Sequence, residues 1–215
     1  MINPSLNNYS IPFYGLKTNM RTGDIVLRRI NQELNSPIKS NTKIGTKIVE
    51  HQSDERYKGL VDKLSDVERK YALQIDKERK RRPDHFQSFE EYIYVLMDSA
   101  TTSGVANCAE RAYIVQSELL KQKEAAHVVK MTLQDKSNPD LKIKLGEHVF
   151  TVFGLKRGSD LTKPEKWGDN AVVVDWWANM VMSARDAIDY YKKILNFNPQ
   201  FQDIKIEDKD LISIE

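Results

Sequence analysis

The sequence predicts an α+β fold in which helices come first, a small antiparallel sheet follows and one further helix lies near the C-terminus. Before residue 125, apolar residues recur at steps of three and four, which is the period of one helix face. After residue 125 they form short runs bounded by turn residues, a pattern typical of strands. Because helices and strands are segregated along the chain, an antiparallel sheet is favoured over a parallel βαβ winding.

The first part of the chain is predicted to be a helical extension, residues 1–87, placed before a core of residues 88–215. Residues 1–50 are rich in Asn, Ser, Thr, Pro and Gly, so we expect loops there with one short helix at about 22–34. A long amphipathic helix is predicted over 54–82. Its apolar face consists of Tyr57, Leu60, Val61, Leu64, Val67, Tyr71 and Ile75.

The long predicted helix has clear ends, because Asp54 can cap its start and Pro83 stops it. Its last residues, 77–82, are strongly basic. Positive charge near a helix C-terminus complements the helix dipole and usually faces solvent. The alternative interpretation is a patch for an acidic partner or lipid headgroups, and the helix would then matter for partner choice rather than for chemistry.

Two shorter helices are predicted at the start of the core, over 89–100 and about 107–123. Ser88 and Glu91 have the spacing of a capping box for the first helix. The residues Thr-Thr-Ser-Gly at 101–104 then break the chain. One face of the second helix carries Cys108, Ala112, Val115 and Leu119.

The period of the apolar residues changes after these helices. The predicted elements are, in order, strands at 125–133, 141–145 and 148–155, a loop at 157–170, a strand at 171–176, a helix from 183 to about 195 and an edge strand at 201–206. Ser183 and Asp186 cap the last helix, and Pro199 closes it. The sheet is therefore expected to lie entirely in the C-terminal part of the chain.

The composition excludes several classes of protein. A formal net charge of +2 over 215 residues is too small to indicate nucleic acid as the main partner. No apolar run reaches the length of a membrane span, so no integral membrane association is expected. The N-terminus lacks the basic and apolar regions of a Sec signal peptide. A single cysteine cannot form an internal disulfide, which fits a reducing compartment. We therefore expect a protein that is cytoplasmic or secreted without a Sec signal peptide.

Three polar residues stand at the ends of predicted elements in the core. Cys108 opens a helix, His148 opens an apolar strand and Asp175 closes the next strand. A helix N-terminus stabilises a thiolate and lowers a thiol pKa from about 8.5. In this order the residue types are the parts of a thiol acyl-transfer enzyme: a nucleophile, a base and a carboxylate that orients the base. We therefore predict Cys108, His148 and Asp175 as the catalytic residues.

Each assignment has an alternative. A cysteine on an apolar helix face is most often a small hydrophobic residue. His127 is the rival base, although its place inside a strand favours a core or surface role. Asp175 is instead a structural cap of a backbone turn in the plainer interpretation, and Asp169 is the nearest other carboxylate. His51 and His85 lie in polar segments and are expected at the surface.

Two tryptophans, Trp176 and Trp177, directly follow the aspartate. Adjacent strand residues point to opposite faces, so one indole is expected in the core. The other would shield the imidazole or line the substrate cleft, unless both simply pack. Zinc would accept Cys108, His148 and Asp175 as ligands. However, no paired spacing such as C-x-x-C or H-x-x-x-H supports a metal, and we expect neither a metal nor a cofactor.

Three short motifs carry these residues: Asn107-Cys108-Ala109-Glu110-Arg111-Ala112, His148-Val149-Phe150-Thr151-Val152 and Val174-Asp175-Trp176. Together they resemble the transglutaminase-like superfamily of papain-like cysteine enzymes, over about residues 88–195. The resemblance implies a nucleophile helix packed on a small antiparallel sheet. The sequence departs from the family pattern at Asn107 and Ala109, where Trp is common beside the nucleophile, and at Phe150, where Trp is frequent. Gln87 and Asn107 are the candidates for the second oxyanion donor.

The resemblance implies an enzyme, a cysteine hydrolase or acyltransferase that acts on an amide of a protein or peptide substrate. The family includes proteases, deamidases and amide-crosslinking transglutaminases, and also inactive members. Among bacteria it includes toxins and secreted effectors that modify host proteins. Hydrolysis, deamidation and crosslinking share one acyl-enzyme, so all three stay open. The alternative is a catalytically inert papain-like fold that serves as a protein-binding module.

Overall fold

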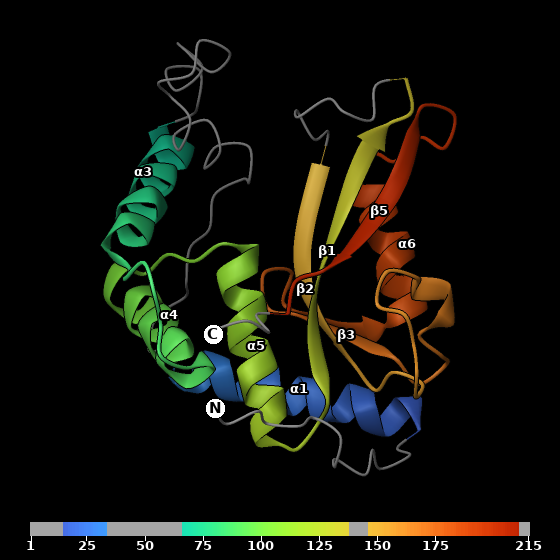
Figure 1. Cartoon of the computed structure of the whole chain (residues 1–215), viewed down its shortest axis with the longest axis horizontal. Helices are drawn as coiled ribbons and strands as arrows, with labels where there is room; N and C mark the ends of the chain where they lie inside the picture. Colours follow the sequence, from blue (N-terminus) through green and yellow to red (C-terminus); the bar gives the residue numbers. More distant parts are fainter. Residues whose placement is uncertain (1–14, 34–65, 138–145, 211–215) are drawn as a thin grey trace.

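The computed structural model describes residues 15–33, 66–137 and 146–210 and confirms the α+β class (Figure 1). Its helices are α1 (Leu16–Glu33), α3 (Asp66–Arg81), α4 (Phe89–Ser103), α5 (Cys108–Lys121), the short 3-10 helix η3 (Pro164–Lys166) and α6 (Ala184–Ile194). Its strands are β1 (Ala126–Asp135), β2 (Gly146–Phe153), β3 (Val172–Asp175), β4 (Met180–Ser183) and β5 (Gln202–Asp208). These strands form a single antiparallel sheet, as predicted.

The sheet has the strand order β4-β3-β2-β1-β5, and every neighbouring pair is antiparallel. At one edge β5 pairs with β1, which confirms the predicted edge strand. The opposite edge, β4, is not among the predicted elements. It forms a hairpin with β3 through residues 176–179, where Asn179 has a left-handed φ of 50°. The strand predicted at 141–145 lies outside the described residues.

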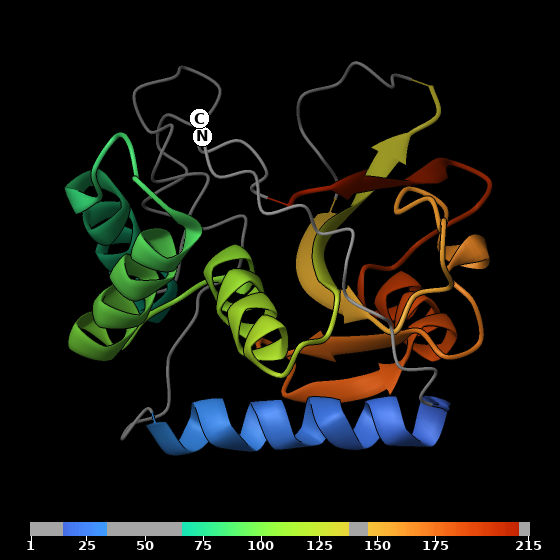
Figure 2. The same ribbon diagram turned by 60° about the horizontal axis from the view of Figure 1, so that its bottom comes forward.

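Helix α1 begins at Leu16, earlier than predicted, and packs along β3 and β4 (Figure 2). Gly23 permits this close approach, because a Cβ there would lie 2.9 Å from a methyl carbon of Val174 and 2.9 Å from one of Val181. The backbone N–H of Leu16 donates to Oδ1 of Asn170 at 3.0 Å, which fixes the first turn of the helix. The buried hydrophobic side chains of α1 are Val26, Leu27 and Ile30.

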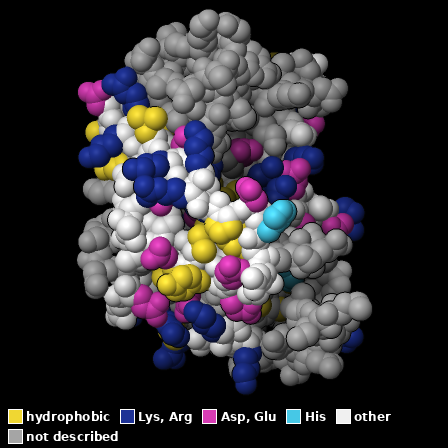
Figure 3. Space-filling view, turned by 60° about the vertical axis from the view of Figure 1, so that its left-hand side comes forward, with side chains coloured by type: hydrophobic (Ala, Val, Ile, Leu, Met, Phe, Trp, Pro, Cys, Tyr) yellow, Lys and Arg dark blue, Asp and Glu magenta, His cyan; other side chains and the backbone are white. Residues whose placement is uncertain are grey.

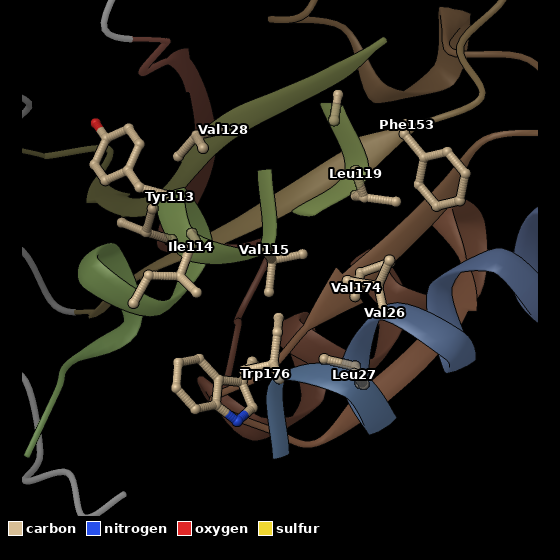
Figure 4. Packing of buried hydrophobic residues seen from close by; sticks show 14 of the residues in the cluster. Val26, Leu27, Tyr113, Ile114, Val115, Leu119, Val128, Phe153, Val174 and Trp176 are labelled. Atoms are coloured by element: carbon tan, nitrogen blue, oxygen red, sulfur yellow. The ribbon is translucent and has the colours of Figure 1, made fainter. Parts of the chain in front are cut away.

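Two hydrophobic clusters cover the two faces of the sheet. One joins the sheet to α1, α4 and α5, and Figure 4 shows part of it, including Val26, Leu119, Phe153, Val174 and Trp176. The other joins the sheet to α6 and contains Phe150, Trp167, Val173 and Tyr191. Neighbouring strand residues face different clusters, as a pleated strand requires. Burial on both faces fixes the register of the strands that carry the predicted site, because a slip of one residue would exchange the two faces.

The helices before the nucleophile helix differ in length from the prediction. The described part of the helix predicted over 54–82 is α3, and residues 54–65 lie outside the described residues. Helix α4 runs on to Ser103 and ends at Gly104, whose φ of 69° is left-handed and suits glycine. Basic and acidic side chains both lie on the face that carries these helices (Figure 3). The division between residues 87 and 88 stays a prediction; α1 and α5, on either side of it, share one cluster.

Candidate active site

Cys108 is the first residue of α5, and hydrogen bonds fix the chain around it. Gly104 ends α4, and the short connection after it leads to Asn107, which is the N-cap of α5. Asn107 and Glu110 form a capping box, in which the Asn107 N–H donates to Oε2 of Glu110 at 3.2 Å. Cys108 itself is 5% exposed. Its thiol is therefore held at a helix N-terminus, where the helix dipole favours an anion.

His148 on β2 and Asp175 at the end of β3 are in direct contact. Nε2 of His148 is 2.7 Å from Oδ2 of Asp175. The same oxygen accepts a hydrogen bond from Oη of Tyr191 on α6 at 2.6 Å. The other carboxylate oxygen accepts from the N–H of Ala178 at 3.1 Å. Asp175 is 2% exposed, so these contacts compensate a carboxylate that would otherwise be costly to bury.

The imidazole of His148 also contacts the cysteine, through a side-chain hydrogen bond between His148 and Cys108. Because Asp175 engages Nε2, Nδ1 is the ring nitrogen left for the thiol. The structure thus brings the three predicted residues together in the order Cys108, His148, Asp175. Tyr191 extends this series of contacts through its hydrogen bond to Asp175, and it is not among the predicted site residues. No sequence signal distinguishes it from an ordinary core aromatic on an amphipathic helix.

The groups around His148 favour the charged form of its imidazole. Burial lowers the pKa of His148, but hydrogen bonds and charge interactions with Asp175 and Cys108 outweigh burial and raise that pKa from 6.5 to about 9. Burial raises the pKa of Asp175, yet the hydrogen bonds to its carboxylate and the charge of His148 hold that pKa below 3.8. Burial and the Asp175 carboxylate raise the pKa of Tyr191 well above 10, so Tyr191 stays a neutral donor.

The free energy of unfolding should depend on pH through this pair. His148 has a pKa near 6.5 when unfolded and about 9 when folded, so its stabilisation is complete below pH 6.5 and is lost as the pH rises through 9. Asp175 acts in the opposite sense, because its lowered pKa stabilises the fold above pH 3.8 and this contribution is lost as the pH falls.

Denaturant unfolding between pH 6 and 10 measures this effect. His148→Ala should remove most of the loss. Cys108→Ala should show a smaller loss than the wild type, because two of the interactions that raise the imidazole pKa come from the thiol. The same pH dependence in the wild type and in His148→Ala would contradict the raised pKa.

Aromatic rings surround the imidazole. The ring centroids of Phe150, Trp177 and Tyr191 lie 6.1, 5.1 and 4.9 Å from that of His148. Trp176 is buried, and its Nε1–H donates to Oδ1 of Asn31 on α1 at 2.9 Å. Trp177 is 40% exposed. One indole of the predicted pair therefore packs in the core, and the other covers the imidazole while remaining partly in solvent.

The basic end of α3 is anchored to the nucleophile helix. Nε of Arg79 lies 2.8 Å from Oε1 of Glu110, and both terminal nitrogens of Arg82 lie 3.3 Å from the same oxygen. Burial raises the pKa of Glu110, but the two arginines outweigh burial and lower that pKa to about 2. The interpretation of this run as a solvated helix end is therefore wrong for Arg79 and Arg82, whereas the partner patch stays a prediction. These two arginines bind the carboxylate that caps α5.

Arg79→Ala and Arg82→Ala should each lower the free energy of unfolding by about 1–3 kcal/mol, because each leaves the buried Glu110 carboxylate with fewer donors. Arg81→Ala is the matched control, since Arg81 belongs to the same run but is mostly exposed and pairs with Glu78 within α3. Its effect should stay within about 0.5 kcal/mol. Denaturant unfolding measures all three variants, and equal losses would contradict the anchoring role.

The rival residues have other partners. Nδ1 of His127 is 2.6 Å from Oδ2 of Asp210, so this histidine belongs to a separate pair. Asp169 is exposed and contacts Arg185. Of the two oxyanion-donor candidates, Asn107 lies at the N-cap directly before Cys108, and Gln87 is exposed before α4. His85 is exposed, as predicted, and His51 lies outside the described residues.

The described residues contain neither a candidate metal cluster nor a membrane-spanning helix. Within them, no group of three or more His, Cys, Asp and Glu side chains could hold a metal ion. Likewise, no helix in the described ranges combines the length and the apolar character needed to cross a membrane. Comparison of the chain with models of known protein families, with characterised proteins and with solved structures found no match.

Proposed function

We propose that this protein is a thiol-dependent acyl-transfer enzyme that acts on an amide of a protein or peptide. The observation that carries the proposal is the imidazole of His148, which is hydrogen-bonded to Cys108 and lies 2.7 Å from Asp175. Its raised pKa favours the imidazolium, and the thiolate is the partner form that it stabilises. A papain- or transglutaminase-like core is the proposed architecture, supported by a nucleophile helix that packs on an antiparallel sheet.

In the first proposed step, Sγ of Cys108 attacks the carbonyl carbon of the substrate amide. The backbone N–H of Cys108, at the start of α5, donates to the oxyanion of the tetrahedral intermediate. When the intermediate collapses, the C–N bond breaks and the nitrogen leaves with the proton held by His148. Asp175, itself fixed by Tyr191, stabilises the imidazolium until that transfer. The products are a thioester on Cys108 and an amine or ammonia.

In the second step, water or an amine attacks the thioester carbonyl. His148, now neutral, accepts the proton of the attacking group, and Cys108 leaves as the thiolate. Attack by water completes hydrolysis of a peptide bond or deamidation of a side-chain amide. Attack by an amine joins two molecules. One acyl-enzyme thus serves all three reactions, and the acceptor that reaches it decides which one occurs.

Intact mass spectrometry tests the proposal. Candidate proteins and peptides are incubated with the wild type or with Cys108→Ala, with and without a primary amine. A gain of about one dalton indicates deamidation, cleavage indicates a protease, and joined masses indicate crosslinking. Activity that persists in Cys108→Ala would refute the proposal.

The second candidate is a catalytically inert papain-like fold that binds a protein. One observation favours it: Cys108 and His148 are each only 5% exposed. Iodoacetamide at neutral pH separates the two candidates without any substrate, because a thiolate nucleophile reacts quickly and a buried structural thiol does not. Rapid modification of Cys108 in the folded wild type supports the enzyme. Modification only after denaturation supports the binding module.

A further inference from the structure

We infer that Arg111 is a positioning residue of this site, which ties the start of the nucleophile helix to the end of the strand that carries Asp175 and places a positive charge beside the thiol of Cys108. The inference rests on the proposed function, because it concerns the same nucleophile. Arg111 is not among the predicted site residues. In sequence it is one more charged residue on a helix.

The contacts of Arg111 span the two parts of the site. It lies on α5 one turn after Cys108 and is 6% exposed. Its Nε donates to the carbonyl oxygen of Ala106 at 3.1 Å, just before the helix. Its Nη1 lies 3.4 Å from the carbonyl oxygen of Trp176, the residue after Asp175. The guanidinium carbon lies 4.9 Å from the ring centroid of the same Trp176. The side chain of Arg111 therefore contacts both the segment just before Cys108 and the residue just after Asp175.

The charge of Arg111 acts on the thiol. Burial lowers the pKa of Arg111 to about 10, and three groups oppose this effect: Asp175, Cys108 and Glu110. Two of them are already engaged, since Asp175 contacts His148 and Tyr191, and Glu110 binds Arg79 and Arg82. Cys108 becomes an anion only when its thiol ionises. Because the interaction is mutual, a guanidinium that is stabilised by the thiolate also stabilises the thiolate.

An arginine suits this place better than a lysine. Its planar fork carries several N–H donors, so Arg111 reaches two carbonyl groups and stacks on an indole at the same time. A single ammonium cannot do all three. This difference separates the two parts of the inference: lysine retains the charge but loses the tie, whereas glutamine retains donors but loses the charge.

The test is the rate of iodoacetamide modification of Cys108 against pH, followed by intact mass, in the wild type, Arg111→Met, Arg111→Gln and Arg111→Lys. The rise of the rate at low pH reports ionisation of the thiol beside His148. In the Met and Gln variants this rise should move up by about one pH unit, a tenfold slower reaction at the foot of the curve. The Lys variant should keep the wild-type midpoint but unfold at a lower temperature. Arg185→Met, which removes an exposed arginine, is the control and should change neither quantity.

Each result tests either the charge role of Arg111 or its tie between the two segments. An unchanged midpoint in both Met and Gln variants overturns the charge role, as does an equal shift in the Lys variant. An unchanged unfolding temperature in Arg111→Lys overturns the tie between the two segments. If Arg111→Met does not fold, the glutamine variant supplies the same charge test. A wild-type protein that resists iodoacetamide until denatured refutes the proposed enzyme itself, whatever the Arg111 variants do.

Discussion

Cys108→Ala is expected to lower turnover by about 10⁴-fold or more and to leave the protein folded. No other cysteine is present to replace the nucleophile. The change removes a single sulfur atom from the cluster between the sheet and α5, so the free energy of unfolding should fall by only about 1 kcal/mol. The mass assay measures turnover, and denaturant unfolding measures stability. If the variant unfolded, its loss of activity would not identify Cys108 as the nucleophile, so both measurements are made on the same preparation.

His148→Ala should lose several orders of magnitude of activity, because it removes both the proton acceptor and the cation that stabilises the thiolate. His127→Ala is the matched control. It removes a histidine from the same sheet, but one that pairs with Asp210. Its effect on turnover should be modest. Equal losses from the two variants, without unfolding, would mean that the base has been assigned to the wrong histidine.

Asp175→Asn should lower turnover roughly 100- to 1,000-fold with little change in substrate binding. The amide has the shape of the carboxylate but not its charge, so the imidazolium loses its stabilising partner and the ring nitrogen protons are no longer fixed. A cysteine–histidine pair remains partly active without its third member, so the loss should be smaller than in Cys108→Ala. Asp169→Asn removes an exposed carboxylate nearby in sequence and should have no effect.

Tyr191→Phe refines this prediction. It removes the hydroxyl that donates to Oδ2 of Asp175 at 2.6 Å and leaves the ring that packs on His148. One donor fewer makes the carboxylate slightly easier to protonate, so a small fall in turnover, about tenfold or less, is expected. Full activity in Asp175→Asn would remove Asp175 from the mechanism and leave a dyad of Cys108 and His148.

The sequence predicted elements whose signals are local. Ser88 caps α4 by accepting from the N–H of Glu91, and Ser183 caps α6 by accepting from the N–H of Asp186, both as predicted. Strand β5 was recognisable because its alternating residues follow a turn. Two of the candidate catalytic residues stand out for the same reason, since Cys108 begins α5 and Asp175 ends β3. His148 was predicted to open its strand but is the third residue of β2, which begins at Gly146. The ends of helices and strands can be predicted from neighbouring residues, without knowledge of contacts between distant segments.

What the sequence did not predict depends on contacts between distant segments. Strand β4 has only four residues, too few to show a period, and exists because it pairs with β3. Arg79 resembles a solvent-facing residue at a helix end until α5 brings Glu110 to it. Tyr191 and Arg111 look like ordinary helix residues for the same reason. Their roles come from an aspartate and a carbonyl group that lie elsewhere in the chain.

The packing of helix α1 on β3 and β4 has a consequence for the synthesis of the protein. Its first turn bonds to Asn170, 154 residues further along the chain, and its Gly23 lies against β3 and β4. On the ribosome α1 emerges before β3 and β4, yet the surface that it covers is made only when those strands have been translated. Closing so long a loop costs entropy, and contacts of this kind slow folding. Until then the apolar side of α1 is open to chaperones. Since β3 also ends in Asp175, the strand that α1 covers is the one that completes the proposed site.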